Sequence, residues 1–189
     1  MELFGSYTSP FVRHCRIVLM SSETPFTFVE TDYVSSAEKS PTKKVPFFRD
    51  GDVMLSDSSS IIKYLREKQG QSFFTDTKEF DQYCLINTLM DTAINLFLLD
   101  KEGIKPQNSA YLTRQNSRLF GGLTTLNDRP LTVRSPFCDG TIRLACFLDW
   151  AKFRDIFDHS SYPNLHALMK KINEWEIFQQ TAPGMKEPS

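Results

Sequence analysis

The segment Tyr7-Thr8-Ser9-Pro10 joins a short apolar run to a helical pattern and places hydroxyl groups where a helix begins. Ser9 followed by Pro10 is typical of an N-cap residue before a proline at the first helical position, and such a cap stabilises a helix by about 1 kcal/mol. The same place can also hold an anion, because the first N–H groups and the positive end of the helix dipole point at it. A thiolate bound there would gain from both, and from a hydrogen bond donated by Ser9.

Neighbouring side chains offer alternatives to this hydroxyl. Tyr7 and Thr8 also carry hydroxyl groups, although strand alternation can turn the Tyr7 ring toward the core or toward a substrate. Cys15 lies almost two turns into the predicted helix, on its apolar face, so we expect it to be buried and inert. We expect Arg13 and His14 to be solvated or to lie at a domain boundary.

The cysteines and histidines do not form a metal-binding pattern. The four cysteines contain no Cys-x-x-Cys pair and no zinc-type spacing to the three histidines, so we expect no metal site. Scattered cysteines in a chain of 189 residues are typical of a reducing compartment. The net charge of −1 predicts no general attraction to nucleic acid or anionic membranes. No apolar stretch reaches the roughly 20 residues of a membrane span, so we expect a cytoplasmic protein.

The first 70 residues combine strand and helix patterns. A strand, a helix and a second strand are followed by a polar loop with weak helical content. A β-hairpin with an Asp-Gly turn and a helix that stops at Gly70 come next. These predicted segments, in order, are residues 2–7, 11–19, 25–31, 34–44, 45–55 and 56–70. They must position the hydroxyl groups at residues 7 to 9.

Beyond the polar connector that follows Gly70, only helical patterns appear. The segment 140–153 is apolar on all sides and predicts a central buried helix. The chain therefore combines an α+β domain with an all-α domain. We expect the α+β domain over residues 1–72, a linker over 73–78 and the helical domain over 79–189.

Four separated segments resemble the glutathione transferase superfamily, in order and in spacing. They are SYTSPFVRHCRIVL, SPTKKVPFFRDGDVMLSDSSSIIKYLRE, LACFLDWAKFR and YPNLHALMKKINEWEIFQQTAP. The first is similar to the TSPFVRK motif of a bacterial subgroup with a serine at the active-site turn. The resemblance implies a thioredoxin-like N-terminal domain, an all-helical C-terminal domain, a glutathione site and a homodimer.

The resemblance also implies roles for individual residues. Ser9 would donate a hydrogen bond to the glutathione thiolate. Val45-Pro46, on its own a plain strand-starting proline, implies a cis bond that presents the Val45 backbone to the cysteinyl part. Asp57 and Ser58, on their own helix-capping residues, would face the γ-glutamyl ammonium and carboxylate groups, the latter at a helix N-terminus.

Two positions depart from the pattern of the superfamily. Lys44 is expected to reach the glycyl carboxylate, but Lys43 stands where a small residue is usual. The helix over 140–153 lacks the usual Ser/Thr-x-x-Asp capping box, and we expect Asp139 to cap it instead.

The function that the resemblance implies is a detoxifying glutathione transferase, which attaches the glutathione thiolate to a small hydrophobic electrophile. Glutathione is then a co-substrate, and no metal is needed. The electrophile would lie near Tyr7 and Thr8, the later part of the helical segment 85–100 and Trp150, with no single lining residue assigned. One alternative is a non-catalytic binding or regulatory protein. Another is a glutathione-dependent thiol or peroxide reductase, which needs a cysteine near position 9, where this chain has Ser9.

Overall fold

The computed structural model describes residues 1–31 and 33–186 and divides the chain into two compact units. Unit 1 combines Met1–Thr75 with the C-terminal residues from Asn173 onward, and unit 2 is Asp76–Ile172. The domain ranges 1–72 and 79–189 remain a prediction. The structure adds to them that the residues after Ile172 group with the N-terminal part of the chain.

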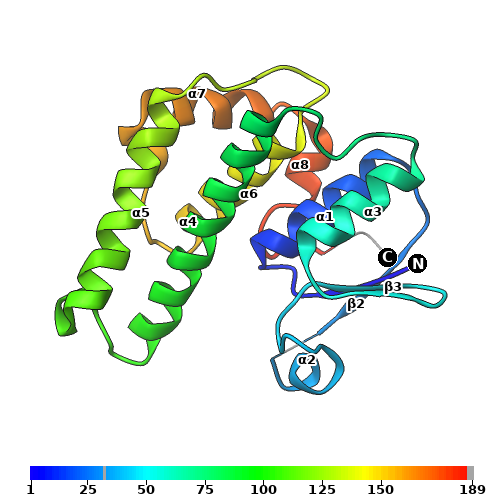
Figure 1. Cartoon of the computed structure of the whole chain (residues 1–189), viewed down its shortest axis with the longest axis horizontal. Helices are drawn as coiled ribbons and strands as arrows, with labels where there is room; N and C mark the ends of the chain where they lie inside the picture. The colour runs from blue at the N-terminus through cyan, green and yellow to red at the C-terminus, as the bar shows by residue number, and fades with distance from the viewer. Residues whose placement is uncertain (32, 187–189) are drawn as a thin grey trace. The chain divides into compact units, whose positions relative to one another are not determined.

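Unit 1 is built on a four-stranded mixed sheet of order β2-β1-β3-β4, with α1 and α3 together on one of its faces (Figure 1). Strand β1 runs parallel to β2 and antiparallel to β3, and β3 pairs antiparallel with β4. This confirms the predicted α+β arrangement. The elements are β1 (Glu2–Gly5), α1 (Pro10–Ser21), β2 (Thr27–Glu30), α2 (Tyr33–Lys39), β3 (Phe47–Asp50), β4 (Val53–Leu55), α3 (Ser58–Lys68) and α8 (Glu176–Gln180).

The segment that the sequence predicts as a mainly polar loop, residues 34–44, contains helix α2. Its few apolar residues give a weak periodic signal, which explains why the helix is missed. The chain leaves the helix at Ser40 and Pro41, and the Lys43 N–H bonds to the Ser40 carbonyl oxygen at 3.0 Å. Only residues 40–44 of the predicted loop are therefore loop.

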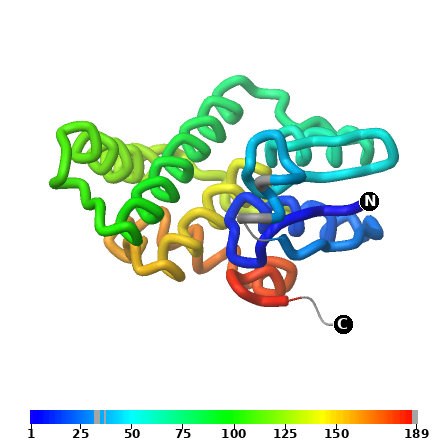
Figure 2. Tube along the Cα trace, turned by 90° about the horizontal axis from the view of Figure 1, so that it is seen from below, coloured from blue at the N-terminus to red at the C-terminus, as the bar shows by residue number. Residues whose placement is uncertain are grey.

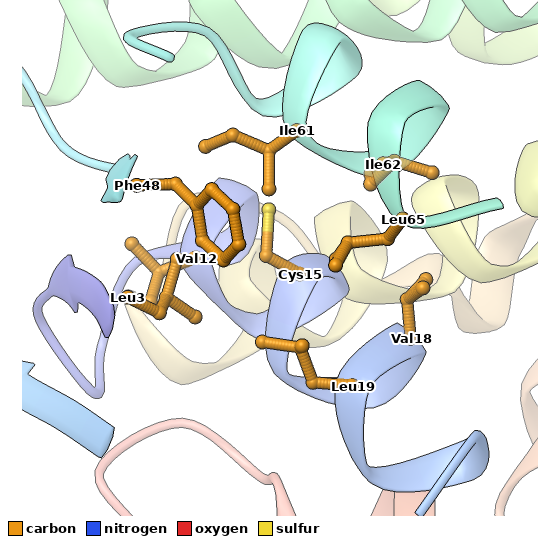
Figure 3. Packing of buried hydrophobic residues seen from close by; sticks show 9 residues of the cluster. All are labelled: Leu3, Val12, Cys15, Val18, Leu19, Phe48, Ile61, Ile62 and Leu65. Atoms are coloured by element: carbon orange, nitrogen blue, oxygen red, sulfur yellow. The ribbon is translucent and has the colours of Figure 1, made fainter. Parts of the chain in front are cut away.

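The core of unit 1 lies between the sheet and the two helices α1 and α3. It consists of Leu3, Val12, Cys15, Val18, Leu19, Phe48, Ile61, Ile62 and Leu65. Figure 3 shows the Cys15 sulfur pointing toward Ile61 of α3. Cys15 is fully buried, and its thiol donates to the Ser58 carbonyl oxygen at 3.9 Å, which confirms the prediction of a buried cysteine.

The regular elements of unit 2, among the residues that the structure describes, are all helices. They are α4 (Thr77–Lys101), η1 (Pro106–Asn108), α5 (Ala110–Asp128), α6 (Asp139–Phe153), η2 (His159–Ser161) and α7 (Pro163–Ile172). Every residue of α6 from Asp139 to Leu148 is buried, as predicted for a central helix. Near the C-terminus, where the sequence predicts only helix, the chain is interrupted between the end of α7 at Ile172 and the start of α8 at Glu176. Within residues 1–31 and 33–186, the structure contains no helix with the length and apolar character of a membrane span.

The prediction that Asp139 caps α6 is wrong by one position. Cys138 is the N-cap residue, and Asp139 is the first residue of the helix. The Cys138 Sγ lies 3.3 Å from the Thr141 Oγ1, which in turn donates to the Thr132 carbonyl oxygen at 2.7 Å. Asp139 instead puts a carboxylate in the first helical turn, where it meets the positive end of the helix dipole.

Candidate functional site

Ser9 is the N-cap residue of α1, with an extended backbone (φ −81°, ψ 126°). Its Oγ accepts the Val12 N–H at 3.4 Å, and its carbonyl oxygen accepts the Arg13 N–H at 2.9 Å. A hydroxyl group has two acceptor lone pairs and one proton to donate, so the cap leaves that proton available to a ligand. The half-buried Ser9 side chain can therefore cap the helix and donate to an anion at once.

The turn before α1 settles the positions of the other hydroxyl groups. Its main chain closes through a bond from the Ser9 N–H to the Ser6 carbonyl oxygen at 3.1 Å. The Thr8 Oγ1 lies 3.1 Å from the Ser6 Oγ, so this hydroxyl interacts within the turn. The Tyr7 ring packs at 4.4 Å, centre to centre, on Phe28 of β2. Ser9 is thus the hydroxyl of this segment that stands at the helix N-terminus.

The loop before β3 lies at the same edge of the sheet as the loop that carries Ser9. Strands β1 and β3 are antiparallel with Phe4 opposite Phe47, so the strand that ends at Gly5 lies beside the strand that begins at Phe47. Val45-Pro46 immediately precedes that beginning, and its peptide bond is cis, as the sequence analysis expects. The register of two strands therefore brings two sequence motifs to one edge.

Helix α3 begins at this edge as well. Strand β4 runs antiparallel to β3 and ends at Leu55, so the chain returns to the edge before α3. Asp57 is the N-cap residue, and its Oδ1 accepts the N–H groups of Ser59 at 2.8 Å and Ser60 at 3.2 Å. Both capping bonds end on the same carboxylate oxygen. The other oxygen, Oδ2, has the lone pairs to accept from an ammonium group.

Ser58, the first residue of α3, is buried and connects the two helices of unit 1. Only 3% of Ser58 is exposed, and its carbonyl oxygen accepts the Cys15 thiol from α1. The helix capped by Ser9 and the helix capped by Asp57 are therefore packed against each other at their N-terminal halves.

The loop that contains Lys43 and Lys44 has an unusual backbone. Lys43 has a φ of +53°, in the left-handed region that favours glycine. This explains why a small residue suits the position and shows that lysine keeps the left-handed conformation at some cost in strain. The Lys44 side chain is exposed beside it.

The expectation that Arg13 and His14 are solvated is wrong, because both are buried, at 2% and 0% exposure, while the alternative of a domain boundary stays a prediction. Arg13 donates to the Phe178 carbonyl oxygen at 2.7 Å and to the Thr181 Oγ1 at 3.4 Å. Its guanidinium group also lies 3.8 Å from the centre of the Phe178 ring. Helix α8 and the residue after it thus cover a face of α1 that the sequence pattern of α1 presents as polar.

A charged cluster on unit 1 belongs to the framework of the unit. The Tyr64 hydroxyl donates to the Asp50 Oδ2 at 2.8 Å, and Lys68 donates to the same oxygen. The hydrogen bond from Lys68, followed by the one from Tyr64, lowers the pKa of Asp50. These contacts tie the hairpin end of β3 to α3. Among the residues that the structure describes, no group of three or more His, Cys, Asp or Glu side chains could hold a metal ion.

Comparison with known proteins places the fold. Residues 3–73 match the family model described as the N-terminal domain of glutathione S-transferase. The uncharacterized GST-like protein YibF of Escherichia coli K12 is 28% identical over 200 residues, covering 97% of this chain and 98% of YibF.

Solved structures share the fold of this protein over nearly the whole chain. A glutathione S-transferase from Methylobacillus flagellatus KT, with glutathione bound, has a TM-score of 0.82 and 24% identity, covering 96% of this chain and 98% of that one. A glutathione transferase family member from Pseudomonas fluorescens Pf-5, also with bound glutathione, has a TM-score of 0.83 and 21% identity, at the same coverage. The family model matches the N-terminal part of the chain, and these structures show that nearly the whole chain has the fold that the sequence analysis predicts.

Proposed function

From the glutathione S-transferase fold of this chain, we propose that it binds glutathione along unit 1 and transfers the thiolate to a small hydrophobic electrophile. The observation that carries the proposal is Ser9, whose hydroxyl caps α1 and keeps its proton for a bound anion. Two relatives of the same fold were solved with glutathione bound.

The physical requirement is a lowered thiol pKa. The free thiol of glutathione resembles that of cysteine, with a pKa of about 8.5, and only the thiolate is the nucleophile. Lowering this pKa by two units needs roughly 2.7 kcal/mol in favour of the anion. A hydrogen bond to a charged group contributes about 1.5–3 kcal/mol, and a helix N-terminus adds about 0.3–1 kcal/mol. Ser9 and the N-terminus of α1 together suffice.

The rest of glutathione lies along the edge of the sheet where the Ser9 turn, Val45-Pro46 and the N-terminus of α3 are found. Its cysteinyl part pairs with the backbone of Val45, next to Pro46. The ammonium group meets the Asp57 carboxylate, and the γ-glutamyl carboxylate lies at the Ser58 end of α3, where helix N–H groups favour an anion. Lys44, exposed on its loop, reaches for the glycyl carboxylate.

The reaction is a displacement or an addition at carbon. The thiolate sulfur donates an electron pair to the electrophilic carbon, and either a leaving group departs with its bonding pair or a neighbouring atom takes a proton from water. A thiol-reductase mechanism is less well supported, because Cys15 is fully buried and position 9 is a serine. A detoxifying role in the cytoplasm and a homodimer complete the proposal; the molecular mass in solution tests the dimer.

The test compares two serines with the same structural role. Ser9 caps α1 and Ser109 caps α5, each accepting the N–H three residues later, at 3.4 and 3.1 Å. Ser9→Ala should lower the rate of glutathione addition to an activated aryl halide at least about tenfold, the effect of one pKa unit. It should also raise the pKa of the bound thiol toward its free value. Ser109→Ala should change neither.

Two results would count against this function. A Ser9→Ala variant with full transfer activity would remove Ser9 from the mechanism. An absence of glutathione binding to the native chain by calorimetry, at millimolar concentration, would favour the non-catalytic alternative instead.

A further inference from the structure

The segment after α8 folds back onto the turn that carries Ser9. Figure 2 shows this segment in red beside the blue turn after β1. In the segment, the Met185 N–H donates to the Ala182 carbonyl oxygen at 2.9 Å, and Gly184 has a φ of +83°. A proline at the second position and a glycine of positive φ at the third are the signature of a type II turn, which Pro183 and Gly184 fulfil.

This C-terminal turn, Ala182–Met185, contacts the backbone of Tyr7. The Gly184 N–H donates to the Tyr7 carbonyl oxygen at 3.2 Å. Just beyond the turn, the Lys186 Nζ lies 5.7 Å from the centre of the Tyr7 ring and forms an ion pair with Glu30 of β2 at 2.8 Å. Both the backbone and the ring of Tyr7 are therefore held by residues from the end of the chain.

Buried Arg16 completes the link to α1. Its guanidinium group lies 4.7 Å from the centre of the Tyr7 ring, and it donates to the Met185 carbonyl oxygen at 3.4 Å. Arg13, three residues earlier on α1, anchors Phe178 of α8 in the same way. Helix α1 thus carries the two arginines that hold the C-terminal segment in place. That segment in turn holds Tyr7, which lies two residues before Ser9, the N-cap of α1.

We propose that the C-terminal turn is a positioning element of the site: by holding Tyr7, it fixes the Ser6–Ser9 turn and so the direction of the Ser9 hydroxyl. Gly184 is the positioning residue, because its positive φ aims its N–H at the Tyr7 carbonyl oxygen. The inference rests on the proposed function, since the hydroxyl must face a ligand. It makes glutathione affinity depend on a turn that need not touch glutathione.

The test uses two substitutions of the same glycine in the full chain. Gly184→Val opposes the positive φ, whereas Gly184→Asn tolerates it and serves as the matched control. Hydrogen exchange of the Thr8 and Ser9 amides is measured without glutathione, and glutathione affinity is measured by calorimetry. Gly184→Val should speed exchange at both amides at least about tenfold and weaken glutathione binding. Gly184→Asn should leave the exchange rates and the glutathione affinity close to those of the native chain.

The exchange and binding measurements separate the possible failures. If Gly184→Val speeds exchange in residues 182–186 but not at Thr8 and Ser9, the positioning role is overturned. If it speeds exchange at Thr8 and Ser9 while neither the native chain nor a variant binds glutathione, the contact is supported and the proposed function alone fails.

A second variant covers the case in which Gly184→Val does not fold. Lys186→Glu changes an exposed side chain and replaces the ion pair with Glu30 by two carboxylates that repel each other. It should also speed exchange at the Ser9 amide, and unchanged exchange there would overturn the proposal.

Discussion

Gly5, the last residue of β1, lies against the first turn of α1, and its lack of a side chain is a packing requirement. A Cβ at Gly5 would lie 2.5 and 2.6 Å from the two methyl carbons of Val12, whereas ordinary contacts lie at 3.4–4 Å. Val12 is fully buried, and its N–H donates to the Ser9 Oγ. Gly5→Ala must therefore displace Val12 or the start of α1, and with it Ser9.

The magnitude follows from the packing. Forcing an extra methyl group into a filled site costs about 1–3 kcal/mol of unfolding free energy, and we expect the upper half of that range, because both methyl groups of Val12 are in the way. Val12→Ala removes these two groups from a buried site and costs about 1.5–3 kcal/mol by itself. In the double variant, the new methyl group enters the vacated space, so the two costs should fall short of their sum by about 1–2 kcal/mol.

Urea unfolding of the native chain, both single variants and the double variant, followed by circular dichroism, measures these free energies. Gly121→Ala is the control, because a Cβ at this helical position meets no atom within 4 Å, and it should stabilise the chain by about 0.5–1 kcal/mol. Calorimetry should show weaker glutathione binding to Gly5→Ala and partial recovery in the double variant. Costs that add to within about 0.5 kcal/mol would refute the predicted close approach of Gly5 and Val12.

Three further predictions concern stability. Arg13→Met should lower the unfolding free energy by about 2–4 kcal/mol, because a carbonyl group and a ring of α8 lose a buried cation; a loss below about 1 kcal/mol in urea unfolding would contradict this. Lys43→Gly should raise the unfolding free energy by about 0.5–1 kcal/mol, because glycine adopts the positive φ without strain. A decrease in the unfolding free energy would show that the backbone is unstrained there. Burial lowers the pKa of His159, only partly offset by Asp158, and its Nδ1 lies 3.3 Å from the Nδ1 of His166. The unfolded chain then binds the proton more readily, so stability should fall as the pH drops below about 6.5. His159→Gln should flatten that slope, and an unchanged slope would exclude His159 as its source.

The elements that sequence analysis predicts well are those that depend on local patterns. The Asp-Gly turn of the hairpin, the stop at Gly70 and the apolar segment of α6 each carry their own signal, and the structure has them as predicted. Helix α2 is missed because a short helix with few apolar residues leaves little periodicity. The break between α7 and α8 has no proline or glycine to mark it.

In the candidate site, too, the features that depend on neighbouring residues are predicted, and those that depend on distant parts of the chain are not. Ser9 and Asp57 are predicted as helix caps from neighbouring residues, and both are N-caps in the structure. Their place at one sheet edge depends on strand register, which the resemblance supplies and the residues alone do not. The burial of Arg13 depends on α8, far along the chain, and periodicity within α1 cannot reveal such a partner. The C-terminal turn is not predicted, although the Pro183-Gly184 pair is a local signal for it.

A crystal structure of the chain with bound glutathione tests most directly whether Ser9 activates the thiol. It should show the sulfur within hydrogen-bonding distance of the Ser9 Oγ, with the γ-glutamyl carboxylate at the N-terminus of α3. A complex in which the Ser9 hydroxyl faces away from the sulfur, or in which the peptide lies at another edge of the sheet, would contradict the mechanism.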